Sequence, residues 1–143
     1  MWHITTIEAI LGEKVDAGLT KLLKTRVGRI LGKTPDDQRQ IRKNFDALYS
    51  LRSDLVHGNA DVSNQTIYLG QLGQAREMAR ALMVWMLEYL RHVRHALPSG
   101  SELPSRETIL NTVDMDEQSR PLVATVLASL PKEFPNIGAW KNT

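Results

Sequence analysis

Apolar residues recur at helical spacing along most of the chain. Between Val15 and Leu31 they follow one another mostly at steps of three and four, as on one face of an α-helix, and no strand-like alternation competes with this pattern. Gly32 and Lys33 come next, a combination typical of a helix C-terminus because a basic residue there favours the negative end of the helix dipole. The pattern therefore predicts a helix over residues 15–31.

The next predicted helix has signals at both of its ends. Thr34 is a suitable N-cap, Pro35 fits the first helical position, and two aspartates follow where the helix dipole favours negative charge. Apolar residues continue at helical spacing to Val56, and Gly58 ends the pattern. The stretch LRSDLVH therefore falls on the last two turns of a helix.

A longer helix is predicted from Ile67 or Leu69 to Leu97. Its apolar positions alternate steps of three and four, which is typical of helices in a bundle. Further apolar residues widen this face, so the helix is expected to need two partners. Trp85 is then either a core residue or part of a dimer interface, and the width of the face favours the interface.

Two short helices are predicted after the Pro/Ser/Gly-rich break at residues 97–105. They span residues 105–112 and 119–130, each with a serine as the expected N-cap. The sequence thus predicts an all-α fold. We divide it into a helical bundle over residues 1–97 and a C-terminal helical extension over residues 98–143 that packs on the same domain.

Composition narrows the class of protein. A chain of 143 residues with 42% hydrophobic content fits one globular domain, and the absence of cysteine excludes disulfides and thiolate metal sites. The most apolar stretch, ALMVWMLEYL, is interrupted by Glu88 and flanked by Arg80 and Arg91, so no membrane span is expected. No secretory signal is recognised either, and a cytoplasmic location is the expectation.

The overall charge does not identify a nucleic-acid-binding protein. The chain has 18 basic and 16 acidic residues, a formal net charge of +2. Basic residues nevertheless gather in one part of the sequence: Lys21, Lys24, Arg26, Arg29, Lys33, Arg39, Arg42 and Lys43. Such a cluster is typical of a solvated helix face.

The most distinctive polar pair is Arg52 and His57, five positions apart in LRSDLVHG. Five steps along an α-helix rotate a side chain by about 140° and advance it by about 7.5 Å, so the two cannot lie side by side on a regular helix. Either the helix loosens before Gly58 and turns the imidazole back, or a second copy of the chain, related by two-fold symmetry, brings both groups into one cleft. Ser53 and Asp54 stand at helical contact spacing from His57.

A purely structural interpretation also explains this pair. A histidine is favoured at a helix C-terminus, where its cationic form interacts with the last carbonyls, and Arg52 would pair with Asp46 or with a neighbouring helix. Tyr49, one turn before Arg52, would bury its ring in the core rather than stack on a base.

The remaining candidates for a chemical site are weak. His92 and His95 lie near one helix face, but two ligands without a third at a suitable spacing do not form a metal site. The sequence lacks the motifs of phosphate-binding loops, serine hydrolases and zinc proteases. We expect neither a metal site nor a cofactor.

Residues 7–97 resemble a HEPN domain of the Apea-like group. The resemblance rests on Glu8, on LxxRVxxILG at residues 23–32 and, most specifically, on LYxLRSxxVHG at residues 48–58. The family usually has Asn, Asp or His directly after the motif arginine. This chain has Ser53 there instead, and an aspartate one place later.

The resemblance implies an antiparallel helical bundle that forms a homodimer, with an R-x(4–6)-H motif lining a cleft at the interface. Active members are metal-independent endoribonucleases of toxin–antitoxin, abortive-infection and other prokaryotic defence systems. RNA and an antitoxin protein are therefore the implied partners. Arg52 and His57 match the two defining positions, and Arg42 and Lys43 are the basic residues expected to contact the substrate.

The implied chemistry suits these residue types. RNA carries its own nucleophile, the 2′-hydroxyl, so cleavage needs a group that moves protons near neutral pH and a cation that binds phosphate. In this hypothesis His57 moves protons, Arg52 binds phosphate, Asp54 or Ser53 orients the imidazole, and Tyr49 is a further candidate for substrate contact. Two other functions stay open: a non-catalytic HEPN dimerisation or RNA-binding module, and a helical interaction domain in which the motif is only a helix terminus.

Overall fold

The computed structural model describes residues 2–59 and 65–131, with only the backbone described at residues 65–67 and 119. All regular structure in these ranges is helical, which confirms the predicted all-α fold. A short 3₁₀ helix, η2 (Glu117–Ser119), precedes the last of the α-helices. The α-helices are α1 (Trp2–Leu11), α2 (Leu19–Leu31), α3 (Pro35–Val56), α4 (Gln65–Ala96), α5 (Arg106–Asp114) and α6 (Pro121–Ser129).

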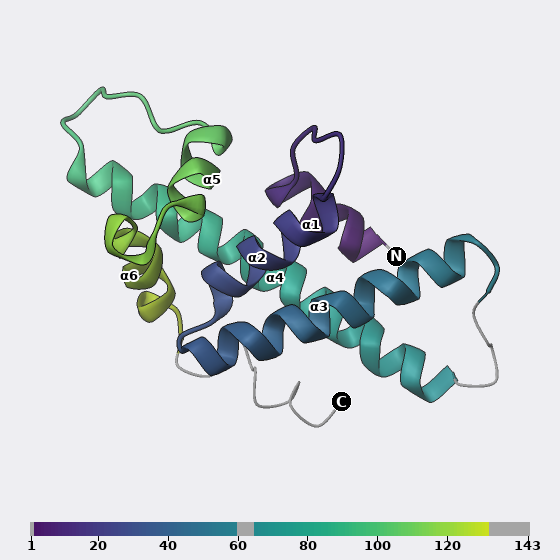
Figure 1. Cartoon of the computed structure of the whole chain (residues 1–143). Coiled ribbons are helices and arrows are strands. Elements are labelled where there is room, and N and C mark those ends of the chain that lie inside the picture. Colours follow the sequence, from purple (N-terminus) through teal and green to yellow (C-terminus); the bar gives the residue numbers. More distant parts are fainter. Residues whose placement is uncertain (1, 60–64, 132–143) are drawn as a thin grey trace.

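Helix α2 is the centre of the bundle. It packs most extensively on α3 and also contacts α1, α4, α5 and α6. Figure 1 shows α3 and α4 running in opposite directions along the molecule, with α5 and α6 at the end where α3 begins. The C-terminal helices thus pack onto α2 and α4, while residues 132–143 of the predicted extension lie outside the described residues.

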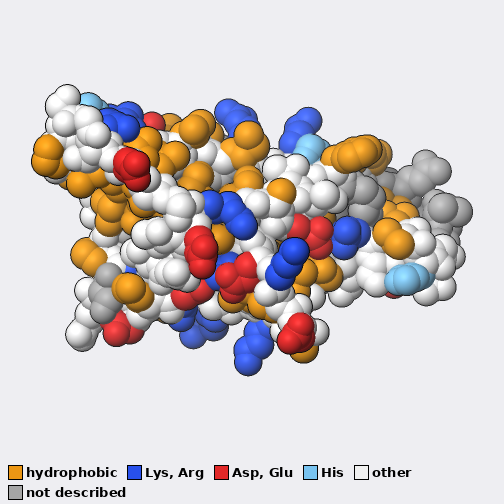
Figure 2. All heavy atoms as spheres, turned by 90° about the horizontal axis from the view of Figure 1, so that it is seen from above, with side chains coloured by type: hydrophobic (Ala, Val, Ile, Leu, Met, Phe, Trp, Pro, Cys, Tyr) orange, Lys and Arg blue, Asp and Glu red, His pale blue; other side chains and the backbone are white. Residues whose placement is uncertain are grey.

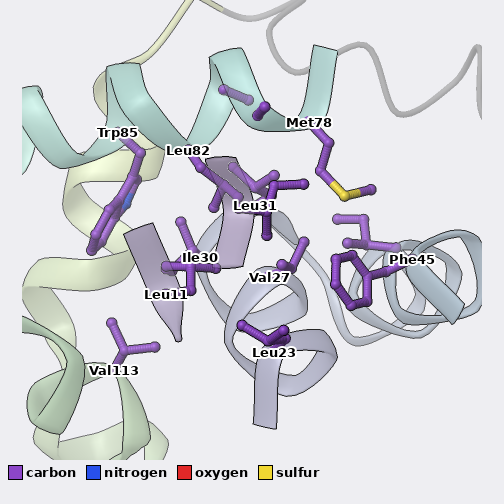
Figure 3. Packing of buried hydrophobic residues seen from close by; sticks show 14 of the residues in the cluster. Leu11, Leu23, Val27, Ile30, Leu31, Phe45, Met78, Leu82, Trp85 and Val113 are labelled. Atoms are coloured by element: carbon purple, nitrogen blue, oxygen red, sulfur yellow. The ribbon is translucent and has the colours of Figure 1, made fainter. Parts of the chain in front are cut away.

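The hydrophobic core follows from this arrangement. Side chains of α2 lie between those of α4 and the neighbouring helices (Figure 3). The core side chains labelled there are Leu11, Leu23, Val27, Ile30, Leu31, Phe45, Met78, Leu82, Trp85 and Val113, all of them buried.

The ends of α2 and α3 show which sequence signals correctly predicted where a helix begins or ends. The Thr34 cap is confirmed, since its Oγ1 accepts a hydrogen bond from the Asp37 N–H at 3.1 Å. Helix α2 begins at Leu19, four residues later than predicted, because Gly18 adopts a left-handed conformation (φ 81°) before it. Gly32 ends α2 as predicted, and a Cβ on it would lie 2.3 Å from the Gln38 side chain. Close packing therefore explains this glycine.

Two predictions about the C-terminal half were wrong or only partly right. Ser105 caps α5, but the last helix begins after Arg120, whose side chain makes no cap bond, and not at Ser119. Trp85 belongs to the core rather than to a dimer interface. It is fully buried and its Nε1 donates to the Val123 carbonyl at 3.4 Å. Helix α6 covers α4 around Trp85, whereas Met83 and Leu87 on the same helix remain exposed.

A buried guanidinium joins three parts of the bundle. The Arg26 side chain on α2 is fully buried and donates to both carboxylate oxygens of Asp114, from Nη2 at 2.6 Å and from Nε at 3.0 Å. It also donates to the Leu11 carbonyl at the end of α1 and, at 3.3 Å, to Glu13. Burial alone lowers the pKa of Arg26, but the hydrogen bonds and charges of Asp114 and Glu13 outweigh it, and the pKa is raised above its ordinary value.

None of the described helices is both long and apolar enough to cross a membrane.

Replacing Arg26 with alanine is expected to lower the free energy of unfolding by about 3 kcal/mol, because it leaves a carboxylate and a carbonyl without their donor. Urea denaturation followed by circular dichroism measures the change. Arg39→Ala is the control, since Arg39 forms an exposed ion pair with Asp36 and its loss should leave stability nearly unchanged. Equal effects of the two substitutions would contradict the structural role of Arg26.

Candidate functional site

Arg52 points from α3 toward α1. Its Nη1 lies 3.2 Å from Oε1 of Glu8, and the Tyr49 hydroxyl donates to the same oxygen at 3.1 Å. The guanidinium carbon also lies 5.8 Å from the centre of the Tyr49 ring, within the range of a cation–π interaction. The Arg52 side chain remains 30% exposed and that of Glu8 21% exposed. Arg52 is thus held in place and still accessible to solvent.

The partner of Arg52 decides between two sequence-based expectations. Asp46 binds Lys24 at 2.9 Å, so the neighbouring-helix alternative is the correct one. Tyr49 packs its ring on the core, 5.9 Å from that of Phe45, as the structural interpretation predicted. Its hydroxyl donates a hydrogen bond to Glu8.

Glu8 is the residue of this cluster to which sequence reasoning assigned no role. It carries part of the family resemblance, and it lies on α1 between the buried residues Ile4 and Leu11, one helical turn from each. A carboxylate on a largely apolar helix face needs a cation or a hydrogen-bond donor as its partner. This rule could have indicated from the sequence that Glu8 binds a residue of another helix.

His57 caps the C-terminus of α3. Its backbone N–H donates to the Ser53 carbonyl at 3.0 Å, so the helical hydrogen-bond pattern continues up to His57. Gly58 then turns into the left-handed region (φ 71°), and the Asn59 N–H donates to the Asp54 carbonyl at 2.8 Å, which completes a Schellman motif. The imidazole itself is exposed.

Regular helix up to this cap keeps the two motif residues apart within one chain. The helix does not loosen before Gly58, so that alternative is wrong, and Arg52 and His57 leave α3 in directions about 140° apart. The side chains of Ser53 and Asp54 are exposed, and among the described residues neither forms a hydrogen bond to the imidazole. One protomer therefore presents the motif as separate groups around the end of a helix.

The two basic residues expected to bind substrate lie elsewhere on α3. Arg42 lies against Gly28 of α2, and its Nε donates to the Gln38 carbonyl at 3.3 Å. Lys43 is exposed, but nine helical steps place it about 13 Å from Arg52 along the axis and on the opposite side of the helix. These residues therefore do not form one cluster with Arg52 or His57.

Metal ligands do not converge in the described part of the chain, where no group of three or more His, Cys, Asp and Glu side chains is placed to hold an ion. His92 binds its own helix instead, with Nδ1 2.8 Å from the Glu88 carbonyl oxygen. His95 is exposed one turn later.

An apolar groove of about 350 Å³ adjoins the end of α3. It is lined by residues of α1, α3 and α4: Ile4, Leu48, Leu51, Leu55, Tyr68, Leu69, Gln71, Leu72 and Ala75. Large apolar side chains around it are exposed, 67% for Val56 and 69% for Leu69. Figure 2 shows charges of both signs over the middle of one face and hydrophobic side chains toward both of its ends, including the end where α3 stops and α4 begins. We call this groove and its exposed neighbours the apolar end.

Comparisons of the chain with models of protein families, with curated proteins and with solved structures found no match.

Gly58→Ala is expected to lower the free energy of unfolding by about 1 kcal/mol, because a residue with a Cβ is strained at this positive φ although the space around it is open. Gly73→Ala is the matched control in the interior of α4, where alanine is expected to raise stability by up to about 1 kcal/mol. Thermal or urea denaturation of both variants tests this. Changes of the same sign would contradict the cap geometry.

Proposed function

We propose that this protein is a metal-independent endoribonuclease of the HEPN type that acts as a homodimer. The observation that carries the proposal is the end of α3, where a half-buried guanidinium and an exposed imidazole stand on consecutive turns beside an exposed apolar surface. Its context would be a prokaryotic defence or toxin–antitoxin system, with RNA as substrate and an antitoxin protein as the partner that restrains it.

A second copy of the chain would bring an arginine and a histidine of the motif together, which one protomer does not do. Since Arg52 and His57 diverge on a regular helix, a shared cleft requires the corresponding residues of a two-fold-related α3. The apolar end supports such an arrangement because Leu55 and Val56, which directly precede His57, and Leu69 on α4 leave apolar surface exposed to water in a single protomer. Association through this surface would bring two copies of the motif together.

The catalytic roles follow from the chemistry of each group. His57 accepts the proton of the ribose 2′-hydroxyl, whose oxygen attacks the phosphorus. The bond from phosphorus to the 5′-oxygen breaks, that oxygen takes a proton from water, and the product is a 2′,3′-cyclic phosphate. Arg52 binds the phosphate and offsets the charge of the transition state. Glu8 engages Nη1 of Arg52, which leaves Nη2 and Nε of the same planar group to face a phosphate. Asp54 or Ser53 would orient the imidazole across the dimer.

A non-catalytic HEPN module for dimerisation or RNA binding is the second candidate. The ion pair between Arg52 and Glu8 favours it, because a guanidinium already bound to a carboxylate and a tyrosine ring is a weaker ligand for phosphate. The two candidates differ in whether RNA is cut or only bound.

His57→Ala is expected to reduce cleavage of a mixed RNA substrate in EDTA by at least about 100-fold, since a positioned proton-transfer group contributes that much or more. Gel analysis of the products measures this, and His95→Ala, which removes an exposed histidine on α4, should cleave like the unaltered protein. Equal cleavage by the His57 variant, or cleavage only with added metal, would exclude this mechanism. If the unaltered protein binds the RNA without cleaving it, the result would favour the non-catalytic module.

Val56→Asp is expected to weaken self-association at least about tenfold, because a carboxylate at the interface loses its hydration without a partner. Sedimentation velocity over a range of protein concentrations measures the dimer constant. Val15→Asp, at an exposed apolar residue between α1 and α2, is the control and should leave association unchanged. A monomer at all concentrations, or equal effects of both variants, would contradict the proposed interface.

A further inference from the structure

A second pocket lies at the other end of α3. It has a volume of about 480 Å³ and is formed by the end of α2, the first turn of α3, η2 and α6. Its α3 residue, Gln38, is nineteen positions from His57, which corresponds to about 28 Å along the helix. The pocket is therefore separate from the apolar end and from Arg52 and His57.

Two arginines converge on this pocket. Nη1 of Arg29 and Nη1 of Arg120 both donate to the Val113 carbonyl oxygen, each at 3.2 Å. Arg29 donates further to the Asp114 carbonyl at 3.0 Å, and Arg120 to the Met115 carbonyl at 2.7 Å. These bonds cap the C-terminus of α5 and engage only Nη1 of each group. Both arginines also line the pocket, and Nη2 and Nε are the donors that these bonds leave unused.

Two cations held on one oxygen repel each other. Burial and then the charge of Arg29 lower the pKa of Arg120, and the carboxylates of Glu117 and Asp116 offset only part of this. A guanidinium stays protonated at neutral pH nevertheless, so the repulsion persists. Among the described residues, the charged side chains that line the pocket are Arg29, Lys33, Arg120 and Glu117, so basic groups predominate. An anion between the two arginines would relieve this repulsion.

Helix α6 gives the pocket an apolar wall. Helix α6 presents Val123 and Leu127, which are buried in the core, and the small exposed residues Ala124 and Ala128. Small side chains leave room for a flat group to lie against the helix. The volume is in the range of pockets that enclose small ligands, which combine apolar walls with a few placed polar groups.

We propose that this pocket binds a phosphate monoester attached to a flat apolar body, as in a nucleoside monophosphate. The phosphate would lie between Arg29 and Arg120, whose planar donors suit its oxygens, and the body would lie against Ala124 and Ala128. The negative charge of the phosphate complements the two guanidiniums. This site does not rest on the proposed ribonuclease function, because neither Arg52 nor His57 contributes to it.

Titration calorimetry with the full chain at constant ionic strength tests the site, with adenosine 5′-monophosphate as the probe and adenosine as the probe without phosphate. Ala124→Glu places a carboxylate in the pocket without touching the α5 cap and is expected to weaken binding of the monophosphate at least about tenfold, as like charges do at close range. Ala124→Gln has nearly the same volume without the charge and should change binding by less than about threefold. Circular dichroism confirms that both variants fold.

The same chemistry occurs free in solution and at the 5′ end of an oligonucleotide, so a short RNA with and without a 5′-phosphate forms a second arm. Stronger binding of the phosphorylated RNA than of the free monophosphate identifies a strand end as the source, and the reverse order identifies a free nucleotide. No binding of either phosphorylated probe, equal binding of adenosine, or equal weakening by Ala124→Glu and Ala124→Gln would overturn the proposal.

Discussion

The buried contact of Arg26 is the constraint on which the arrangement of the helices depends. One planar group on the central helix binds both oxygens of Asp114 on α5 and the last carbonyl of α1. The N–H donors of a guanidinium point in fixed directions, and each needs an acceptor when the group is buried. The acceptors at the ends of α1 and α5 are therefore held in fixed positions relative to α2. The apolar core fills the remaining space but does not set these directions.

Arginines play the same part at other helix ends. Arg106 of α5 donates to the Gly12 carbonyl beyond α1 at 2.6 Å, and Arg29 and Arg120 donate to the carbonyls that end α5. The last carbonyls of a helix lack partners within it, and a cation favours the negative end of the dipole. The basic cluster near α2 is therefore only in part a solvated surface. Arg26 and Arg29 are structural, whereas Lys43 is the kind of exposed residue that the pattern predicted.

Local signals in the sequence predicted most of the fold. Caps such as Thr34 and Ser105 and the apolar spacing of α2, α3 and α4 located the helices within a few residues. Contacts between distant segments were not predictable in this way. The burial of Trp85 depends on α6, and the partner of Arg52 lies 44 positions away on α1. Spacing along one helix says which side chains share a face but not which helix covers it.

The same difference between local signals and contacts of distant segments applies to the candidate site. Helix geometry correctly placed Arg52 and His57 on different sides of α3, since the helix is regular up to its cap. The involvement of Glu8 and the groove between α1, α3 and α4 required the packed structure, because each combines residues from separate helices. Arg42 and Lys43 share a sequence cluster but face different surroundings, and periodicity alone does not reveal that difference.

The pairing of Arg26 with Asp114 has a consequence for synthesis on the ribosome. The two residues are 88 positions apart, so at ordinary elongation rates α2 is made on the order of ten seconds before the carboxylate that completes its core. Until α5 is made, the guanidinium lacks the carboxylate that neutralises it in the core, although its bonds to the Leu11 carbonyl and to Glu13 involve residues already synthesised. The arrangement of α1 and α2 around this guanidinium is therefore complete only once Asp114 has been added to the chain.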